Sequence, residues 1–528
     1  MQQINEPMRR LPVGIQNFSV LREEGYLYVD KTDLVWNIAN RGYAYNYLSR
    51  PRRFGKSLLV DTFQCYFEGR KELFEGLKIM DLENEWTVRP VIRFDMSKSG
   101  ETLDGLQSCL DSVFCESESK YEIEGAEDRP FQRRFHDIIA AAYRVSGRRV
   151  AILVDEYDYP LLHSWGTEEH EKCAAAYRDV FAILKADGAM IHFVFITGVA
   201  KFTQISLFSS LNNIVNLSFD PQYECLCGIS EPEMLNNFAP EVEAMADENG
   251  WTKDETLARL KENYDGYHFS RKCIADIYNP FNLVYAFSQK DINDYWAASG
   301  ATALLPKFIG GMELKLQNFD NCSVDRRVLE TSDITISRPE LFLYQSGYLT
   351  IKSYGDGVYT LGFPNGEVRR TLYGFVLPAL LENSDIRTTT TQNQLLRYLK
   401  KGNVSEAMPL LKALVADVPY SNKKLASMDM EERYRLIIST ILNAIGLNVE
   451  VEHMLATGRI DMVATSLKFI YVIELKLKKN GGLDAAARQI VTNQYLAPFL
   501  HLDRKVLGLA IELDDLGGGI TGWREVEE

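Results

Sequence analysis

The stretch "YAYNYLSRPRRFGKSLLVDTFQCYF", residues 43–67, combines three kinds of local sequence. An aromatic run at 43–49 is typical of a short strand, a basic turn follows it, and "KSLLVDTFQCYF" has the apolar spacing of a helix. The turn ends in "GKS", as a phosphate-binding loop does, but Arg50 stands where the usual pattern has its first glycine. The stretch alone leaves two interpretations open, a working phosphate site and a basic turn that ends in GKS by chance.

Apolar runs downstream of this stretch predict further strands, and they alternate with helical patterns. The strands are expected at 90–97 ("PVIRFDMS"), 148–158 ("RRVAILVDEYD") and 190–198 ("MIHFVFITG"), and the helices at 102–120, 131–145 and 168–187. The run at 148–158 is continuously apolar until it ends in acids, as a buried parallel strand does. This alternation predicts a parallel sheet with helices on both faces.

Two further regions follow. The pattern from about 223 to 420 is mainly helical, with a short strand pair near 342–362, and the polar segment 419–429 is the best linker candidate. The last hundred residues contain a helix at 430–447, alternating strands, an Ala-rich helix and a final strand at 505–513. We therefore expect an α/β domain at 1–220, a mainly helical lid or connector at 221–420 and a smaller α/β domain at 421–528.

Composition narrows the class of protein. The chain has 528 residues and a net charge of −15, which argues against a broad basic surface that coats nucleic acid. Any contact with DNA or RNA must then depend on local patches. Its eight cysteines form no C-x-x-C pair, and no run approaches 18 apolar residues. We expect a cytoplasmic protein with reduced thiols and no membrane span.

The residues for a nucleotide site fall in two of these segments. Gly55, Lys56 and Ser57 at a helix start supply backbone N–H groups, an ammonium for phosphate oxygens and a hydroxyl for Mg²⁺. Asp155 and Glu156 end a buried strand, where one carboxylate can hold Mg²⁺ and the other can polarise an attacking water. Together these motifs predict ATP binding, although two acids that merely end a strand in solvent would look the same.

Other residues near this site have two interpretations each. Thr197 ends the next strand, where it either senses the terminal phosphate or satisfies the strand end. Arg50, Arg52 and Arg53 crowd the turn. They either contact phosphates in place of the missing backbone contacts, which we slightly favour, or form a solvated basic turn.

A second set of chemical groups lies near the C-terminus, in "GRIDMVATSLKFIYVIELKLK" (458–478). Glu474 and Lys476 are two residues apart on a strand and so share one face. If 464–469 form a hairpin turn, Asp461 falls opposite Glu474. Two carboxylates that bind Mg²⁺ beside one lysine suit metal-dependent phosphodiester hydrolysis.

The same pattern has a simpler explanation, because an exposed edge strand that alternates Glu and Lys also contains E-x-K. The preceding "GRID" strand and the following "ARQI" helix favour the nuclease-like interpretation. Gln489 on that helix and Glu432 on the helix before the sheet are candidates to complete the pocket.

Ordered motifs along nearly the whole chain resemble bacterial proteins that join an AAA-ATPase-like domain to a C-terminal PD-(D/E)xK nuclease-superfamily domain. The motifs are "YLYVDKT" (26–32), "RPRRFGKSLL" (50–59), "LVDEYDYPL" (153–161), "FITGVAKFTQISLFSSLNN" (195–213), "NYDGYHF" (263–269), "IYNPF" (277–281), "DYWAASG" (294–300), "GRIDMV" (458–463), "IELKL" (473–477) and "ARQI" (487–490). The resemblance implies a P-loop NTPase domain with an AAA- or STAND-like parallel sheet, a helical middle region and a restriction-endonuclease-like α/β domain.

The resemblance also bears on the site residues. It makes the missing glycine a normal feature of the loop, and implies ATP contact by Gly55, Lys56 and Ser57, with Asp155 and Glu156 as the acidic pair. In the C-terminal domain it implies a Mg²⁺ site at Asp461 and Glu474 with Lys476, and secondary roles for Gln489 and Glu432. One departure is that "VTNQY" lacks the lysine expected near Asn493 or Gln494.

These expectations combine into an ATP-dependent switch that controls a Mg²⁺-dependent nuclease acting on nucleic acid, on DNA in preference to RNA. Defence against mobile DNA, or its propagation, is an association that the resemblance carries. The alternative is a nucleotide-gated interaction protein with a catalytically inactive nuclease-like domain. Formation of a homo-oligomer stays open.

Overall fold

The computed structural model describes residues 9–201, 214–298, 305, 316–331, 338–381, 386–418 and 428–527. Contacts between residues divide the chain into two compact units, Met1–Leu305 with Cys322–Pro364, and Pro306–Asn321 with Asn365–Glu528. Each unit is described by itself below. The domain boundaries expected near 220 and 420 remain predictions, and most of the linker candidate at 419–429 lies outside the described residues.

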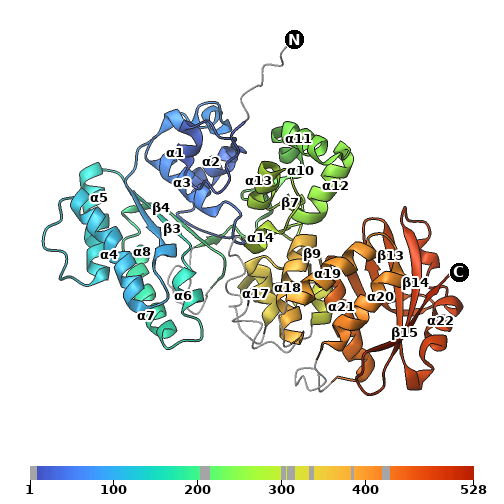
Figure 1. The fold of residues 1–528 in the computed structure, drawn as a ribbon. Coiled ribbons are helices and arrows are strands. Elements are labelled where there is room, and N and C mark those ends of the chain that lie inside the picture. Colours follow the sequence, from blue (N-terminus) through green and yellow to red (C-terminus); the bar gives the residue numbers. More distant parts are fainter. Residues whose placement is uncertain are drawn as a thin grey trace, which may run out of the picture. The chain divides into compact units, whose positions relative to one another are not determined.

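The first unit is built on a five-stranded parallel sheet, as predicted (Figure 1). Its strands, in spatial order, are β2 (Val91–Asp95), β3 (Val150–Asp155), β4 (Ile191–Gly198), β1 (Tyr45–Ser49) and β5 (Val215–Asn216). Every residue of β3 is buried, which explains its continuous apolar sequence. Because the strands are parallel, their polar C-terminal ends meet along one edge of the sheet.

Helices cover both faces of this sheet. They are α1 (Phe18–Glu23), α2 (Thr32–Asn40), α3 (Lys56–Phe67), α4 (Leu103–Lys120), α5 (Phe131–Ser146), α6 (Tyr159–His163), α7 (Glu169–Phe181) and α8 (Ile183–Ala186). Phe63 of α3 packs on Phe193 and Phe195 of β4. On the other face, Phe94 of β2 contacts rings from α4, α5 and α7. The predicted helices at 102–120, 131–145 and 168–187 are confirmed.

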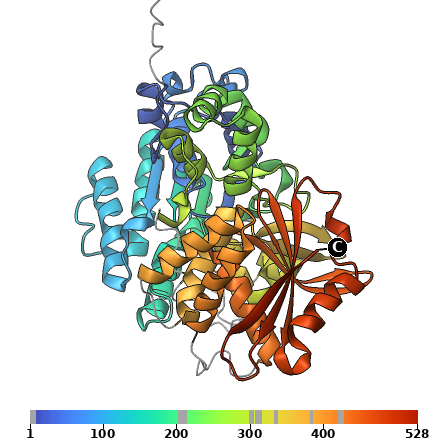
Figure 2. The ribbon, with the colours of Figure 1, turned by 45° about the vertical axis from the view of Figure 1, so that its right-hand side comes forward.

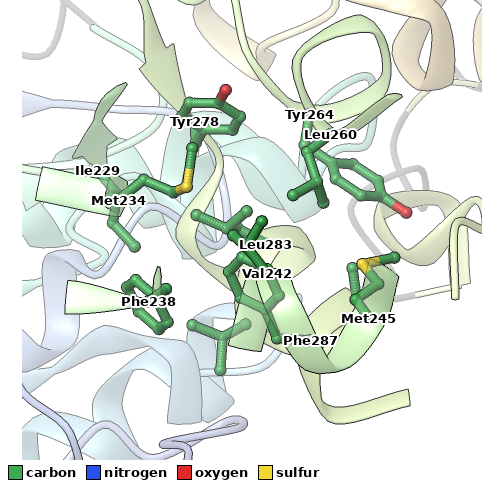
Figure 3. Close-up of a cluster of buried hydrophobic side chains, with 12 residues drawn as sticks. Ile229, Met234, Phe238, Val242, Met245, Leu260, Tyr264, Tyr278, Leu283 and Phe287 are labelled. Atoms are coloured by element: carbon green, nitrogen blue, oxygen red, sulfur yellow. The ribbon is translucent and has the colours of Figure 1, made fainter. Parts of the chain in front are cut away.

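A small helical subdomain follows in the same unit. It contains α10 (Glu231–Asn237), α11 (Ala239–Asn249), α12 (Lys253–Tyr264), α13 (Pro280–Gln289), α14 (Tyr295–Ala298) and the paired strands β6 (Ile229–Ser230) and β7 (Ile277–Tyr278). Capping boxes begin α10 and α12. Figure 3 shows its core, in which Phe238, at the start of α11, packs with Leu283 and Phe287 of α13.

The rest of this unit holds a three-stranded antiparallel sheet. Its elements are β8 (Cys322–Asp325), α16 (Arg326–Thr331), α17 (Pro339–Ser346), β9 (Thr350–Gly355) and β10 (Val358–Gly362). The expected strand pair near 342–362 is therefore β9 with β10, whereas 342–346 belong to a helix. Pro339 starts that helix and Gly347, at φ 90°, ends it.

The second unit combines helices with a mixed sheet. Its elements are α18 (Gly366–Leu381), α19 (Ile386–Leu399), α20 (Val404–Ala416), α21 (Met430–Ala444), β11 (Asn448–Leu455), β12 (Gly458–Thr465), β13 (Phe469–Leu477), α22 (Gly482–Thr492), β14 (Lys505–Leu513) and β15 (Ile520–Val526). The strands lie in sequence order, and only β13 and β14 pair in parallel, joined through α22. Figure 2 shows this sheet in red beside the orange helices of the same unit. Sequence analysis missed β15.

Short 3₁₀ helices complete the described structure, at Lys71–Phe74, Lys78–Asp81, Met96–Lys98, Pro221–Tyr223, Leu316–Asn321, Lys478–Asn480 and Ala497–Phe499. Within the described ranges, no helix has both the length and the apolar character that crossing a membrane requires.

Candidate functional site

The loop between β1 and α3 leads the backbone directly into a helix N-terminus. Gly55 caps α3 at φ 85°, a left-handed conformation that glycine adopts without strain. Arg53 also has a positive φ of 69°, and its guanidinium lies 4.8 Å from the ring centroid of Phe281. Ser57 follows in the first turn of α3. The first N–H groups of a helix have no partner within it, so this end favours an anion.

Lys56 points back into the loop and not out to solvent. Its ammonium donates to the carbonyl oxygens of Arg50 and Pro51, both at 3.0 Å, and its side chain is buried. Burial lowers the pKa of Lys56, and the carboxylates of Glu156 and Asp155 oppose that shift. The lysine is thus a buried cation at the centre of the loop, beside the acidic pair.

Arg50, which replaces the usual glycine, is also buried, but it faces the protein interior. Its guanidinium donates to the carbonyl oxygens of Ser49 and Ser218 at 2.9 Å and of Tyr223 at 3.0 Å. It lies 4.1 Å from the ring centroid of Phe269. These bonds fix the start of the loop to segments that lie far away in sequence, so the slight preference for phosphate contact by Arg50 is not supported.

The acidic pair lies at the C-terminal end of β3, next to the end of β4. Thr197 donates its hydroxyl to Asp155 Oδ1 at 2.6 Å, and the backbone N–H of Glu156 donates to the same oxygen at 3.1 Å. Glu156 has a φ of 49°, so the chain turns sharply after β3. Burial raises the pKa of Glu156, and Lys56 opposes the shift.

Most of the residues predicted for the nucleotide site line one cavity of about 450 Å³ in the first unit. Its lining includes the predicted residues Arg53, Gly55, Lys56, Ser57, Asp155 and Glu156. Thr197 is not part of the lining, but its hydroxyl donates to Asp155 Oδ1 and accepts the backbone N–H of Glu156 at 3.4 Å. The volume is typical of sites for small organic ligands, and loop cations beside strand-end carboxylates suit a nucleotide with a hard cation.

Sequence analysis missed two groups of residues in this cavity. One is Asp95, which ends β2 in register with Asp155 and also lines the cavity. The strand "PVIRFD" ends in an acid as β3 does, so that signal was present in the sequence. The other group comes from the helical subdomain, which contributes Phe238, Phe281 and Val284 as an apolar wall.

In the second unit, the predicted pairing of Asp461 with Glu474 follows from the register of β12 and β13. Met462 pairs with Ile473 and Ala464 with Tyr471, so Asp461 and Glu474 are the next pair. The N–H of Leu475 donates to Asp461 Oδ2 at 2.9 Å. The hairpin turn is shorter than expected, because the strands continue to Thr465 and resume at Phe469.

Glu474 and Lys476 form a partly buried ion pair. Lys476 Nζ donates to Glu474 Oε1 at 3.1 Å, and Glu474 is only 1% exposed. Burial, together with the charge of Asp461, raises the pKa of Glu474 to about 7. Burial lowers the pKa of Lys476, but the charge and hydrogen bond of Glu474 outweigh burial, so the pKa of Lys476 is raised. The three predicted residues are therefore neighbours in one polar site.

Two further charged residues, which sequence analysis missed, belong to this site. Arg435 of α21 contacts Asp461 Oδ1 and Glu452 Oε1, both at 3.2 Å. Glu452 lies on β11 at the position across from Asp461, and it has a φ of 57° where the register between Val451 and His453 skips one pair. The helix-to-sheet contact cannot be read from local spacing, since it depends on how α21 packs.

The predicted secondary residues lie at the margin of this site. Gln489 donates to the hydroxyl of Tyr495 at 3.2 Å, and Tyr495 donates to the carbonyl of Arg459 at 2.9 Å. Asn493, where a lysine was expected, also donates to Tyr495. On α21, it is Glu431, the residue before Glu432, that accepts the N–H of Leu477 at the end of β13.

A divalent ion at this site would have a small set of protein ligands. Among the residues described, no group of three or more His, Cys, Asp or Glu side chains is placed to hold a metal. Asp461 and Glu474 would supply two carboxylates, with backbone and water oxygens completing the shell. The fit requires Arg435 to release Asp461 Oδ1, because a guanidinium already occupies that side of the carboxylate.

Comparisons with known proteins identify a family for the domain around each candidate site. Residues 12–208 match the family described as "Predicted AAA-ATPase", and residues 429–520 match the "PD-(D/E)XK nuclease superfamily". The chain joins an AAA-ATPase-like domain to a PD-(D/E)XK nuclease-superfamily domain. The first match contains the loop and the acidic pair, and the second contains α21 and β11–β14.

A relative of similar length extends the likeness over the whole chain. A protein of Azotobacter chroococcum mcd 1, described as an uncharacterized protein in the vnfD 5' region, is 29% identical over 530 residues. The alignment covers 98% of each chain. The region between the AAA-ATPase-like and nuclease-superfamily domains is thus present in that relative as well.

Proposed function

We propose that this protein is an ATP-binding and ATP-hydrolysing switch whose nucleotide state controls a Mg²⁺-dependent nuclease-like domain. The observation that carries the proposal is one chain with two separate polar sites, the loop cavity around Lys56 and the carboxylate pair beside Lys476. The substrate is nucleic acid, DNA in preference to RNA. The setting that we propose is the bacterial cytoplasm, in defence or mobile-element biology, with a homo-oligomer as an open question.

In the nucleotide site each residue has a proposed role. Gly55, Lys56 and Arg53 bind phosphate oxygens, and Ser57 with Asp155 holds Mg²⁺. Glu156 orients the attacking water, which a carboxylate does best when its pKa lies close to the working pH. The raised pKa of Glu156 supports this role. Thr197 positions Asp155 through their 2.6 Å hydrogen bond.

In the nuclease-like site, Asp461 and Glu474 would hold Mg²⁺, and the bound ion would supply an acidified water and positive charge beside the phosphate. Lys476 orients that water and stabilises developing negative charge. Gln489 is placed by Tyr495 beside the backbone of β12, and supports the substrate side of the site.

A second candidate function is favoured by one contact. The ion pair of Arg435 with Asp461 neutralises the carboxylate that the metal needs. A domain that keeps this pair would bind nucleic acid or a partner without cleaving it. The protein would then be a nucleotide-gated interaction protein with an inactive nuclease-like domain.

Two single substitutions test the chemistry of the two sites separately. Glu156→Gln is expected to reduce ATP hydrolysis about a hundredfold or more, as the loss of a positioned general base does, whereas the exposed Glu101→Gln leaves it unchanged.

Lys476→Ala is expected to abolish cleavage of supercoiled plasmid with Mg²⁺, whereas the exposed Lys478→Ala retains it. Equal cleavage by Lys476→Ala and wild type would refute the nuclease assignment. Absence of cleavage by the wild type with any divalent metal would favour the second candidate.

A further inference from the structure

Basic residues gather at the edge of the first sheet that lies opposite the nucleotide cavity. Arg89 precedes β2, Arg148 and Arg149 precede β3, and His192 is the second residue of β4. Backbone bonds bring these strand starts together: Ala151 N–H donates to the carbonyl of Pro90, and Val150 N–H to that of Met190, both at 2.9 Å. Because the strands are parallel, this N-terminal edge is a strand length away from the acidic C-terminal edge. We call Arg89, Arg148, Arg149 and His192 the arginine edge.

In the described part of the chain, the arginines of this edge form no ion pair with a carboxylate. Among the described residues, no carboxylate oxygen lies within 4.0 Å of a guanidinium nitrogen of Arg89, Arg148 or Arg149. Two other arginines near the start of α5 differ, since Arg129 and Arg133 both pair with Asp137. In a chain with a net charge of −15, this group of arginines forms a local basic patch.

The basic residues of the arginine edge lie close enough to lower one another's pKa. Arg149 approaches His192 Nδ1 at 3.5 Å. Burial lowers the pKa of Arg89, and the charges of Arg149 and Arg148 lower it further, while Glu85 opposes them. Burial, with Arg89 and Arg149, lowers the pKa of His192 to about 4, so this ring is neutral at neutral pH. Shifted pKa values next to like charges identify a candidate functional site, and a group of arginines suits an anion.

The arginine edge is held by rigid structure. Gly147, at φ 64°, ends α5, and Ser146 Oγ accepts the N–H of Arg148 at 3.1 Å. Arg89 N–H donates to the carbonyl of Phe67 at 2.7 Å. Arg148 and Arg149 are exposed, as are the neighbouring side chains of Tyr143 and Val145. The C-terminus of α5 accounts for nearby cations such as Arg144 and Arg148, but not for Arg89, which precedes β2.

We propose that the arginine edge binds the phosphate backbone of nucleic acid. Guanidinium groups pair with phosphate oxygens in a bidentate manner, and an acidic protein can only hold nucleic acid through such a local patch. The inference rests on the proposed function, because it identifies a surface of the AAA-ATPase-like domain that recruits the same substrate. Contacts to the backbone carry no base specificity, so binding is sequence-independent and sensitive to salt.

The test uses the full chain and fluorescence anisotropy with a short fluorescein-labelled DNA duplex in EDTA, where no cleavage occurs. The variant is Arg148→Gln with Arg149→Gln. Its control, Arg129→Gln with Arg133→Gln, makes the same change in net charge at paired arginines. We expect the variant to bind about tenfold more weakly, with a slope of log K against log salt that is smaller by about 2. The control is expected to match the wild type.

Replacement of both arginines by lysine, Arg148→Lys with Arg149→Lys, keeps the charge and is expected to preserve the salt slope. ATP affinity, measured in parallel, should be the same in all variants, because the loop lies at the opposite edge of the sheet. Wild-type affinity and slope in the Arg148→Gln, Arg149→Gln variant would overturn the proposal, as would a wild type that binds no duplex. A variant that loses only a polyglutamate probe would also overturn it, in favour of an acidic protein partner.

This experiment separates the proposal from the proposed function. Binding in EDTA does not depend on catalysis. If the wild type binds DNA through the arginine edge but never cleaves it, the binding proposal stands and the nuclease proposal is wrong. If the Arg148→Gln, Arg149→Gln variant binds and cleaves DNA as the wild type does, the nuclease proposal stands and the binding proposal is wrong.

Discussion

Arg50 occupies the position of the first glycine in the usual phosphate-binding loop, but its side chain faces the protein interior. The usual first glycine of a phosphate loop permits a tight approach of the backbone to the ligand. Here a buried arginine instead ties the loop to the carbonyl oxygens of Ser218 and Tyr223. The loop is therefore shaped by tertiary contacts, which local sequence could not disclose.

The interior role of Arg50 has a measurable consequence. Arg50→Lys keeps the charge but cannot reach three carbonyl oxygens at once, so we expect the free energy of unfolding of the first unit to fall by about 3 kcal/mol. Urea denaturation measures the change, with the exposed Arg144→Lys as control. If Arg50→Lys left stability unchanged and weakened ATP binding instead, Arg50 would be a phosphate ligand.

Arg435 is the corresponding residue in the second unit. Its guanidinium competes with a metal for Asp461, so we expect Arg435→Met to raise the affinity for Mn²⁺ or Mg²⁺ about tenfold, or about 1.4 kcal/mol. Titration calorimetry or Mn²⁺ electron paramagnetic resonance measures this without any cleavage. Arg459→Met is the control, since Arg459 pairs with Glu452. Unchanged or weaker metal binding in Arg435→Met would mean that the guanidinium supports the site.

At the scale of elements, the segment that follows α12 connects the helical subdomain to the loop. Tyr267 and Phe269 pack edge-on against Phe54, with ring centroids 4.8 and 5.4 Å apart. Arg50 lies over the ring of Phe269 as well. The motif "NYDGYHF" thus packs against the loop between β1 and α3, a contact that depends on the tertiary fold and not on local sequence.

The same segment contains a buried acid that makes stability depend on pH. Burial raises the pKa of Asp265 from its usual 3.8 to about 7. The folded state then binds a proton that the unfolded state has released, so stability falls as pH rises from about 4 to about 7. We expect Asp265→Asn to flatten that part of the pH dependence of the unfolding midpoint, measured by thermal denaturation. An identical pH slope in variant and wild type would exclude Asp265 as its source.

Site residues could be predicted from the sequence where local structure positions them, but not where tertiary packing does. Asp461 and Glu474 were paired correctly because a hairpin sets its register within a few residues. Asp155 was placed at a strand end because a buried strand has a clear apolar pattern. Asp95 was missed because strand order is a tertiary property, and Arg435 because it reaches the site from a helix that packs from outside the sheet.

At the scale of the whole molecule, each of the two units holds one candidate site. Control of the nuclease-like site by the nucleotide site would require a coupling free energy between the two sites. Such couplings are typically about 1 to 3 kcal/mol, or roughly 5- to 150-fold in affinity, and they are reciprocal. If ATP changes the affinity for nucleic acid by some factor, nucleic acid changes the affinity for ATP by the same factor. The charge of −15 favours recruitment through a local basic surface such as the arginine edge.

The most direct test of the switch is the rate of plasmid cleavage with Mg²⁺, measured with and without saturating ATP in the wild type and in Lys56→Ala. We predict that ATP changes the wild-type rate at least about fivefold, and that Lys56→Ala cleaves at the wild-type rate without ATP and does not respond to it. Wild-type cleavage that is the same with and without ATP, or an unaltered response in Lys56→Ala, would contradict control of the nuclease-like domain by the nucleotide site.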